Sequence, residues 1–97
     1  MGAKKEKIRV TVSREEVREL EISFPYYTKD EGMWCKFFSR GVAIWVVDFP
    51  FIKQIQYSSC GVPEVWLINK EISEEEFNTK FNEVMDALID INNEKTI

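Results

Sequence analysis

The chain has 97 residues, of which 44% are hydrophobic and 31% charged, and its formal net charge is −4. This length suits one domain, and the apolar content is too high for a disordered chain. An acidic balance is unusual for a dedicated nucleic-acid binder. Because the chain has no histidine, it has no Ser-His-Asp triad, no Cys-His pair and no histidine-ligated zinc site.

Two cysteines, Cys35 and Cys60, are too few for the disulfide framework of a small secreted protein. They are also too few for a structural zinc site, and no phosphate-binding glycine motif occurs. The longest nearly apolar run, residues 42–47, is too short to cross a bilayer, and no segment has the layout of a signal peptide. We therefore expect a cytoplasmic, non-catalytic protein with no cofactor, no metal and no membrane contact.

Residues 1–6 are expected to form a flexible lead-in, residues 7–92 one α+β domain, and residues 93–97 a frayed end. Alternating apolar and polar side chains predict two half-buried strands after the lead-in. The apolar positions are Ile8, Val10 and Val12 in the first strand and Leu20, Ile22 and Phe24 in the second. Residues 13–16 would be the turn. Because Ser13 and Glu16 also form an S-x-x-E capping box, a short helix over residues 14–20 is the alternative.

The middle of the chain predicts further short strands. Pro25 indicates a bend or a sheet edge because it cannot donate to a ladder, and residues 29–32 predict a loop in which Gly32 can take a positive φ. Strands are then predicted over residues 33–39 and 42–48, joined by a tight turn. Another strand is predicted over residues 51–57, with Lys53 near a sheet edge, and a short one over residues 65–68.

The clearest local signal is a helix over residues 72–91. Ser73 and Glu76 form a capping box, and Ile72 with Phe77 fits a hydrophobic staple. Apolar side chains then recur every three or four residues, at Phe77, Phe81, Val84, Leu88 and Ile91. Residues 60–97 hold three Lys/Arg against nine Asp/Glu, so the outer face of this helix is acidic.

These elements predict an α+β fold: a mainly antiparallel, curved meander of five to six strands with the C-terminal amphipathic helix packed on one face. The central strands are apolar on both faces. We assign Trp34, Phe38 and Trp45 to one face, and Cys35 and Phe37 to the other. One helix covers only one face. The other must be covered by the curled sheet itself or by a second copy of the chain, or it must be a binding surface.

A protein-interaction module fits this pattern best. It would bind a protein partner, or form a homodimer, through the aromatic sheet face, the acidic helix or both. The candidate surface comprises Trp34, Lys36, Phe38, Arg40 and Trp45. The first alternative is single-stranded nucleic-acid binding, because the same aromatic and basic side chains would suit stacked bases and phosphates. The second is a small molecule bound between helix and sheet.

Overall fold

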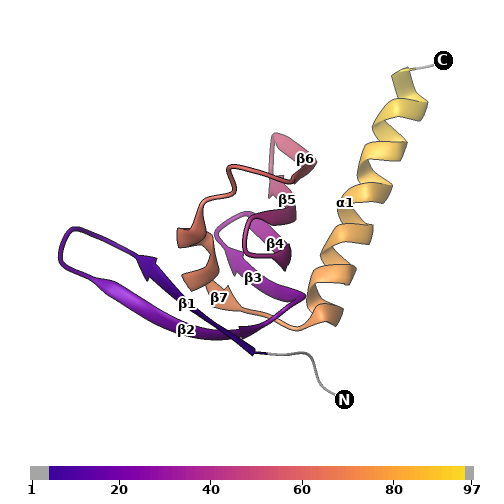
Figure 1. The fold of residues 1–97 in the computed structure, drawn as a ribbon. Coiled ribbons are helices and arrows are strands. Elements are labelled where there is room, and N and C mark those ends of the chain that lie inside the picture. Colours follow the sequence, from indigo (N-terminus) through magenta and orange to yellow (C-terminus); the bar gives the residue numbers. More distant parts are fainter. Residues whose placement is uncertain (1–4, 96–97) are drawn as a thin grey trace.

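A computed structural model describes residues 5–95 of the chain, with side chains up to residue 90. Within that range the chain forms seven strands, one short 3₁₀ helix (η1) and one α-helix (Figure 1). The bounds are Lys5–Thr11 (β1), Val17–Ser23 (β2), Tyr26–Asp30 (β3), Met33–Ser39 (β4), Val42–Phe49 (β5), Ile52–Ser58 (β6), Glu64–Ile68 (η1), Lys70–Glu71 (β7) and Glu74–Lys95 (α1). Lys5 and Glu6 of the predicted lead-in belong to β1, and residues 93–95 of the predicted frayed end belong to α1. The rest of these two segments, residues 1–4 and 96–97, lies outside the described residues.

Five strands form one antiparallel sheet in the order β6-β5-β4-β3-β7. Strands β3 to β6 follow one another as a meander, each joined to the next by a short turn. After η1 the chain returns to the sheet, where β7 pairs with β3 at the edge opposite β6. The predicted α+β fold, with an antiparallel sheet and a C-terminal helix, is confirmed.

Strand β3 occupies part of the segment predicted as a loop. Residues Tyr26–Asp30 pair with β4, and only Glu31 and Gly32 turn the chain. Gly32 has a φ of 71°, as predicted, and its carbonyl accepts a hydrogen bond from the Asp48 N–H at 2.9 Å. The polar side chains of Lys29 and Asp30 suggested a loop, but Lys29 pairs with Lys70 of the two-residue strand β7 near the sheet edge.

The predicted strand over residues 65–68 is wrong, because these residues belong to the 3₁₀ helix Glu64–Ile68. The Trp66 N–H donates to the Pro63 carbonyl at 3.2 Å, and the Asn69 N–H donates to the Trp66 carbonyl at 3.3 Å. These are the i to i+3 bonds of a 3₁₀ turn. A short apolar run does not distinguish a strand from a helical turn, since both bury consecutive side chains.

Strands β1 and β2 pair antiparallel as a separate two-stranded sheet. The Val12 N–H donates to the Glu16 carbonyl at 2.9 Å, and the Ser13 N–H donates to the same carbonyl at 3.2 Å. The predicted turn over residues 13–16 is therefore confirmed. The alternative helix over residues 14–20 does not form, because β2 begins at Val17.

Helix α1 begins where the capping box placed it. The Ser73 hydroxyl accepts a hydrogen bond from the Glu76 N–H at 3.0 Å. Ile72 and Phe77 are buried in the same cluster, as a hydrophobic staple requires. Phe81, Val84 and Leu88 continue this stripe onto the sheet, whereas the side chain of Ile91, the last predicted member, lies outside the described side chains.

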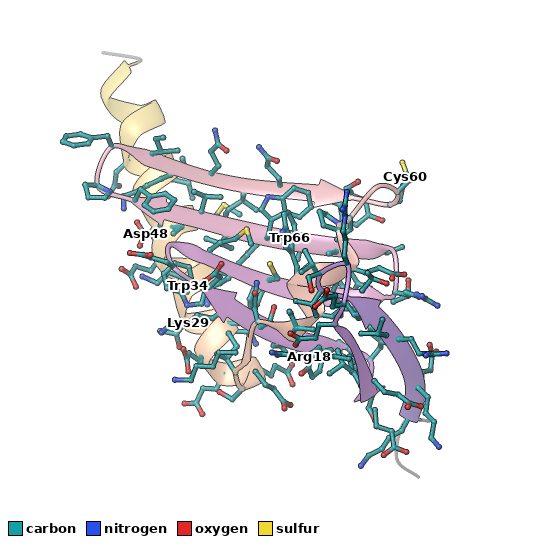
Figure 2. All side chains as sticks on the ribbon, turned by 90° about the vertical axis from the view of Figure 1, so that its left-hand side faces the viewer. Arg18, Lys29, Trp34, Asp48, Cys60 and Trp66 are labelled. Atoms are coloured by element: carbon teal, nitrogen blue, oxygen red, sulfur yellow. The ribbon has the colours of Figure 1, made fainter. Side chains whose placement is uncertain are left out.

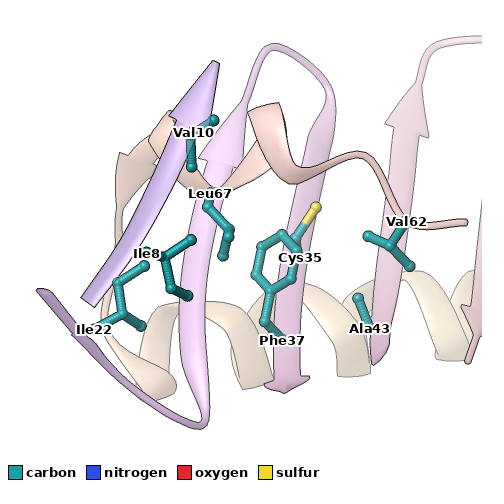
Figure 3. Packing of buried hydrophobic residues seen from close by; sticks show 8 residues of the cluster. All are labelled: Ile8, Val10, Ile22, Cys35, Phe37, Ala43, Val62 and Leu67. Carbon is teal, nitrogen blue, oxygen red and sulfur yellow. The ribbon is translucent and has the colours of Figure 1, made fainter. Parts of the chain in front are cut away.

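Two clusters of buried side chains hold the layers together, one on each face of the five-stranded sheet. The cluster under α1 contains Tyr27, Val46, Ile72, Phe77 and Val84. The cluster under the β1–β2 hairpin and η1 contains Ile8, Val10, Ile22, Cys35, Phe37, Ala43, Val62 and Leu67 (Figure 3). Figure 1 shows the hairpin and α1 on opposite sides of the sheet. The chain thus covers its own second sheet face, with a separate hairpin rather than with curled sheet ends.

Among the residues that the structure describes, no helix is long and apolar enough to cross a membrane.

Candidate interaction surface

The register between β4 and β5 separates the residues predicted to form one surface. Trp34 is opposite Val46, and Cys35 is opposite Trp45. Directly opposed residues of an antiparallel pair share a face. Trp34 therefore faces α1 with Val46, while Trp45 faces the hairpin with Cys35. The prediction that Trp34 and Trp45 share a face is wrong, because face assignment across a turn depends on the register, which period-two alternation within each strand does not give.

Trp45 is part of the core on the hairpin side. Its ring meets that of Trp66 edge to face, with centroids 5.2 Å apart and an interplanar angle of 74°. Trp66 comes from η1, so the pair fixes the 3₁₀ helix to the sheet. Both rings pack against the buried cluster of that face. Trp45 therefore packs as a core side chain and does not belong to an open binding surface.

Trp34 lies beside a shallow groove between the sheet and the first turns of α1. The Lys80 Nζ is 4.6 Å from the centroid of the indole ring, and the Lys29 Nζ is 5.8 Å from it. These distances suit cation–π contacts. The groove has a volume of about 410 Å³ and is lined by Lys29, Trp34, Ser73, Glu75, Glu76, Thr79, Lys80 and Glu83. Its charges are largely engaged with one another, since Lys29 pairs with Glu76 at 3.6 Å and Lys80 with Glu83 at 3.3 Å.

Asp48 joins three elements at this end of the sheet. Its carboxylate accepts hydrogen bonds from Lys53 on β6 and from Lys80 on α1, the latter at 2.9 Å. These two ammonium groups lower the pKa of Asp48, and the same carboxylate raises the pKa of Lys80. Figure 2 shows Asp48, Trp34 and Lys29 at one end of their strands, away from Cys60. Local sequence patterns do not locate this cluster, because Lys53 follows Asp48 across a turn and Lys80 is 32 residues away from Asp48 along the chain.

The remaining predicted site residues extend from the middle of β4 to the turn after it. The register shifts between Phe37 and Ser39, so Phe38 sits at a bulge and 45% of its surface is exposed. Its ring contacts that of Tyr57, which is 62% exposed, at a centroid distance of 6.4 Å. The Lys36 Nζ lies 5.0 Å from the Phe38 centroid. Arg40 forms an exposed ion pair with Glu64, and that carboxylate raises the pKa of Arg40.

The turn between β5 and β6 presents apolar side chains that lie outside the surface predicted from the sequence. Phe51 is 98% exposed, and Phe49 and Ile52 beside it are 41% and 50% exposed. Turns are normally polar, so the Phe-Pro-Phe-Ile string around Pro50 was the available signal. Because this string also ends one predicted strand and begins the next, alternation alone does not mark its side chains as exposed.

Helix α1 adds a second exposed apolar row next to its buried stripe. Met85 and Ile89, four residues apart, are 37% and 49% exposed. The helix contacts β6, β5 and β4. We name the exposed apolar side chains on β6, on the turn before it and on neighbouring elements the β6 surface: Phe38, Phe49, Phe51, Ile52, Tyr57, Met85 and Ile89.

In the described part of the chain, no group of three or more His, Cys, Asp or Glu side chains is placed so that it could hold a metal ion.

Comparison of the chain with protein-family models, with curated proteins and with solved structures gave no match in any of the three.

Proposed function

We propose that this chain is a small, non-catalytic cytoplasmic interaction module that binds protein through the β6 surface. The observation that carries this proposal is the concentration of exposed apolar side chains around one strand at the sheet edge. Phe51, with 98% of its surface exposed, is the extreme case. These side chains lie on both faces of the edge, because Phe49 and Ile52 face the hairpin side and Tyr57 faces α1. A partner that covers the edge itself would bury both groups, and exposed apolar area of this kind usually marks an interaction site.

The β6 surface replaces most of the surface predicted from the sequence. Of the five predicted residues, only Phe38 belongs to it. The exposed acidic side chains of α1 remain available to a basic partner, but Lys29 and Lys80 already neutralise Glu76 and Glu83 in part. For this reason we place recognition on the apolar side chains, with the acidic helix face beside them.

Two alternatives find less support. Single-stranded nucleic acid would stack on aromatic side chains that share one open face. Trp34 and Trp45 lie on opposite faces of the sheet, and Trp45 packs against the core. A small molecule would favour an enclosed, mostly apolar cavity, whereas the groove beside Trp34 is shallow and lined mainly by charged and polar side chains.

Site-specific photocrosslinking in the native host tests this proposal. A benzophenone amino acid in place of Phe51 changes an exposed aromatic side chain for a larger one and leaves the core untouched. The matched control carries the same group in place of Glu15, which is exposed in the β1–β2 turn. We expect a discrete protein adduct from position 51 and none from position 15. Equal adduct levels at both positions, or no adduct from position 51, would contradict the proposal.

A further inference from the structure

Strand β6 is an edge strand with few of the usual protections. Proteins guard sheet edges with charged residues, proline, bulges or short length, because unpaired backbone groups recruit other strands. The opposite edge follows this rule, since β7 has two residues and both are charged. Strand β6 has seven residues and one charge, Lys53, which is bound to Asp48. Within the described residues, no other strand pairs with its outer side.

The register with β5 shows which backbone groups of β6 point outward. The Asp48 N–H donates to the Gly32 carbonyl, on the side away from β6. The Asp48–Lys53 pair is therefore not a hydrogen-bonded pair of the β5–β6 ladder, and such pairs alternate with hydrogen-bonded ones. Gln54 and Gln56 thus bond to β5, whereas the N–H and C=O groups of Lys53, Ile55 and Tyr57 point outward.

We propose that β6 pairs antiparallel with β6 of a second copy of this chain, with the two Ile55 residues opposite each other. This inference rests on the proposed function, for which it names the partner. In this register Lys53 is opposite Tyr57 of the second copy, so all three outward-pointing residues pair, through about six backbone hydrogen bonds. Lys53 meets an aromatic ring rather than a like charge, which favours the pairing. Gln54 is opposite Gln56 on the other face, where their amides can hydrogen-bond.

The length of α1 supports this arrangement. Its 22 residues span about 33 Å, whereas the four spacings between five strands span about 19 Å. Figure 1 shows the helix crossing the strands and continuing past β6. A second sheet joined to this edge would lie beneath the projecting turns, close to the exposed row of Met85 and Ile89.

Helix α1 covers only part of the sheet face on its side. The part that it leaves uncovered fits a dimer with a two-fold axis. Lys80 binds Asp48, which pairs with Lys53, so α1 crosses near the Lys53 end of β6. The other end is open, and Phe38 and Tyr57 are exposed there. A two-fold axis through Ile55 places the Lys53 end of one copy beside the Tyr57 end of the other. Each projecting helix then approaches the open Phe38–Tyr57 pair of its partner.

Light scattering coupled to size exclusion tests the pairing. We expect the wild-type protein to have twice the chain mass of 11.5 kDa. Tyr57→Pro removes an outward N–H and spares the bonds to β5, so it should weaken the dimer about a hundredfold or more. Tyr57→Ala keeps the N–H and loses only the exposed ring, so it should weaken the dimer much less. Circular dichroism establishes that each variant is folded.

A second pair of variants is independent of the β6 backbone. Ile89→Glu places a charge on the projecting helix and should weaken the dimer, while Asn82→Glu, at another exposed position of α1, should not. A wild-type monomer would overturn the proposal, as would a dimer that withstands both Tyr57→Pro and Ile89→Glu. A Phe51 crosslink to a different protein, found with a wild-type monomer, would overturn the self-pairing and leave the interaction module standing. The absence of any crosslink from position 51 would contradict the proposed interaction module itself.

Discussion

Cys35 and Cys60 lie in opposite environments, and their reactivity should differ accordingly. Cys35 is fully buried in the cluster on the hairpin side, and burial raises the pKa of its thiol to about 12. Cys60 is exposed beyond β6. Because the thiolate is the reactive form, we expect a thiol reagent at pH 8 to modify only Cys60 in the native protein and both thiols after unfolding. If mass spectrometry showed that Cys35 in the native protein is modified at a rate similar to that of Cys60, this core packing would be contradicted.

Asp48 should make the stability of the protein depend on pH in the acid range. Its pKa is lowered by hydrogen bonds from Lys53 and Lys80, so the unfolded chain binds a proton more readily than the folded one. The stabilisation is fully present above the ordinary pKa of about 4 and disappears as the pH falls below it. We expect Asp48→Asn to be destabilised most at neutral pH, with the difference from wild type shrinking below about pH 4. A difference that does not change with pH in urea denaturation would be inconsistent with this cluster.

The sequence located single residues well where the signal was local. Gly32 has the positive φ that its turn requires, Ser73 caps its helix, and Cys35 is in the core. It did not locate the Asp48 cluster, because Lys53 and Lys80 reach that carboxylate from different elements. Side-chain partners separated by a turn, or by the 32 residues between Asp48 and Lys80, depend on packing that local patterns do not encode.

The two S-x-x-E segments form different elements because the residues after them differ in periodicity. Ser73 precedes a stripe at helical spacing and caps α1, while Ser13 precedes alternating side chains and lies in a hairpin turn. We expect Ser73→Ala to reduce the free energy of unfolding by about 1 kcal/mol, because the Glu76 N–H loses its acceptor. Ser13→Ala is the matched control, with an expected change within about 0.5 kcal/mol. Equal effects in chemical denaturation would mean that the Ser73 cap contributes nothing specific.

Alternation of apolar and polar side chains predicted where the strands lie along the chain. It did not predict the register between strands. Met33–Ser39 was predicted with its observed bounds, because its alternation is uninterrupted. The assignment of Trp34 and Trp45 to one face failed, because register is a property of the pair of strands. The apolar run in η1 is ambiguous because its conformation also depends on contacts with other elements. It follows from packing beneath the hairpin, not from the residues of the run alone.

At the scale of the molecule, the β1–β2 hairpin supplies the layer that one helix leaves missing. A single helix cannot cover a sheet that is apolar on both faces, and Ile8 and Ile22 cover the second face. We expect Ile22→Ala to lower the free energy of unfolding by about 2–5 kcal/mol, because the side chain is buried between the hairpin and the sheet. A loss below about 1 kcal/mol in denaturant titration would mean that the hairpin is not part of the cooperative fold. The sequence showed that a covering layer was needed, but not which segment supplied it.

The proposed self-pairing of β6 is tested most directly by amide hydrogen exchange, measured residue by residue by NMR. Gln54 and Gln56 bond to β5 and should be protected at every protein concentration. If β6 pairs with a second copy, the amides of Ile55 and Tyr57 should become comparably protected at concentrations where the dimer forms. Rapid exchange of Ile55 and Tyr57 at all concentrations, beside protected Gln54 and Gln56, would show that the outer edge of β6 is open and would contradict the dimer.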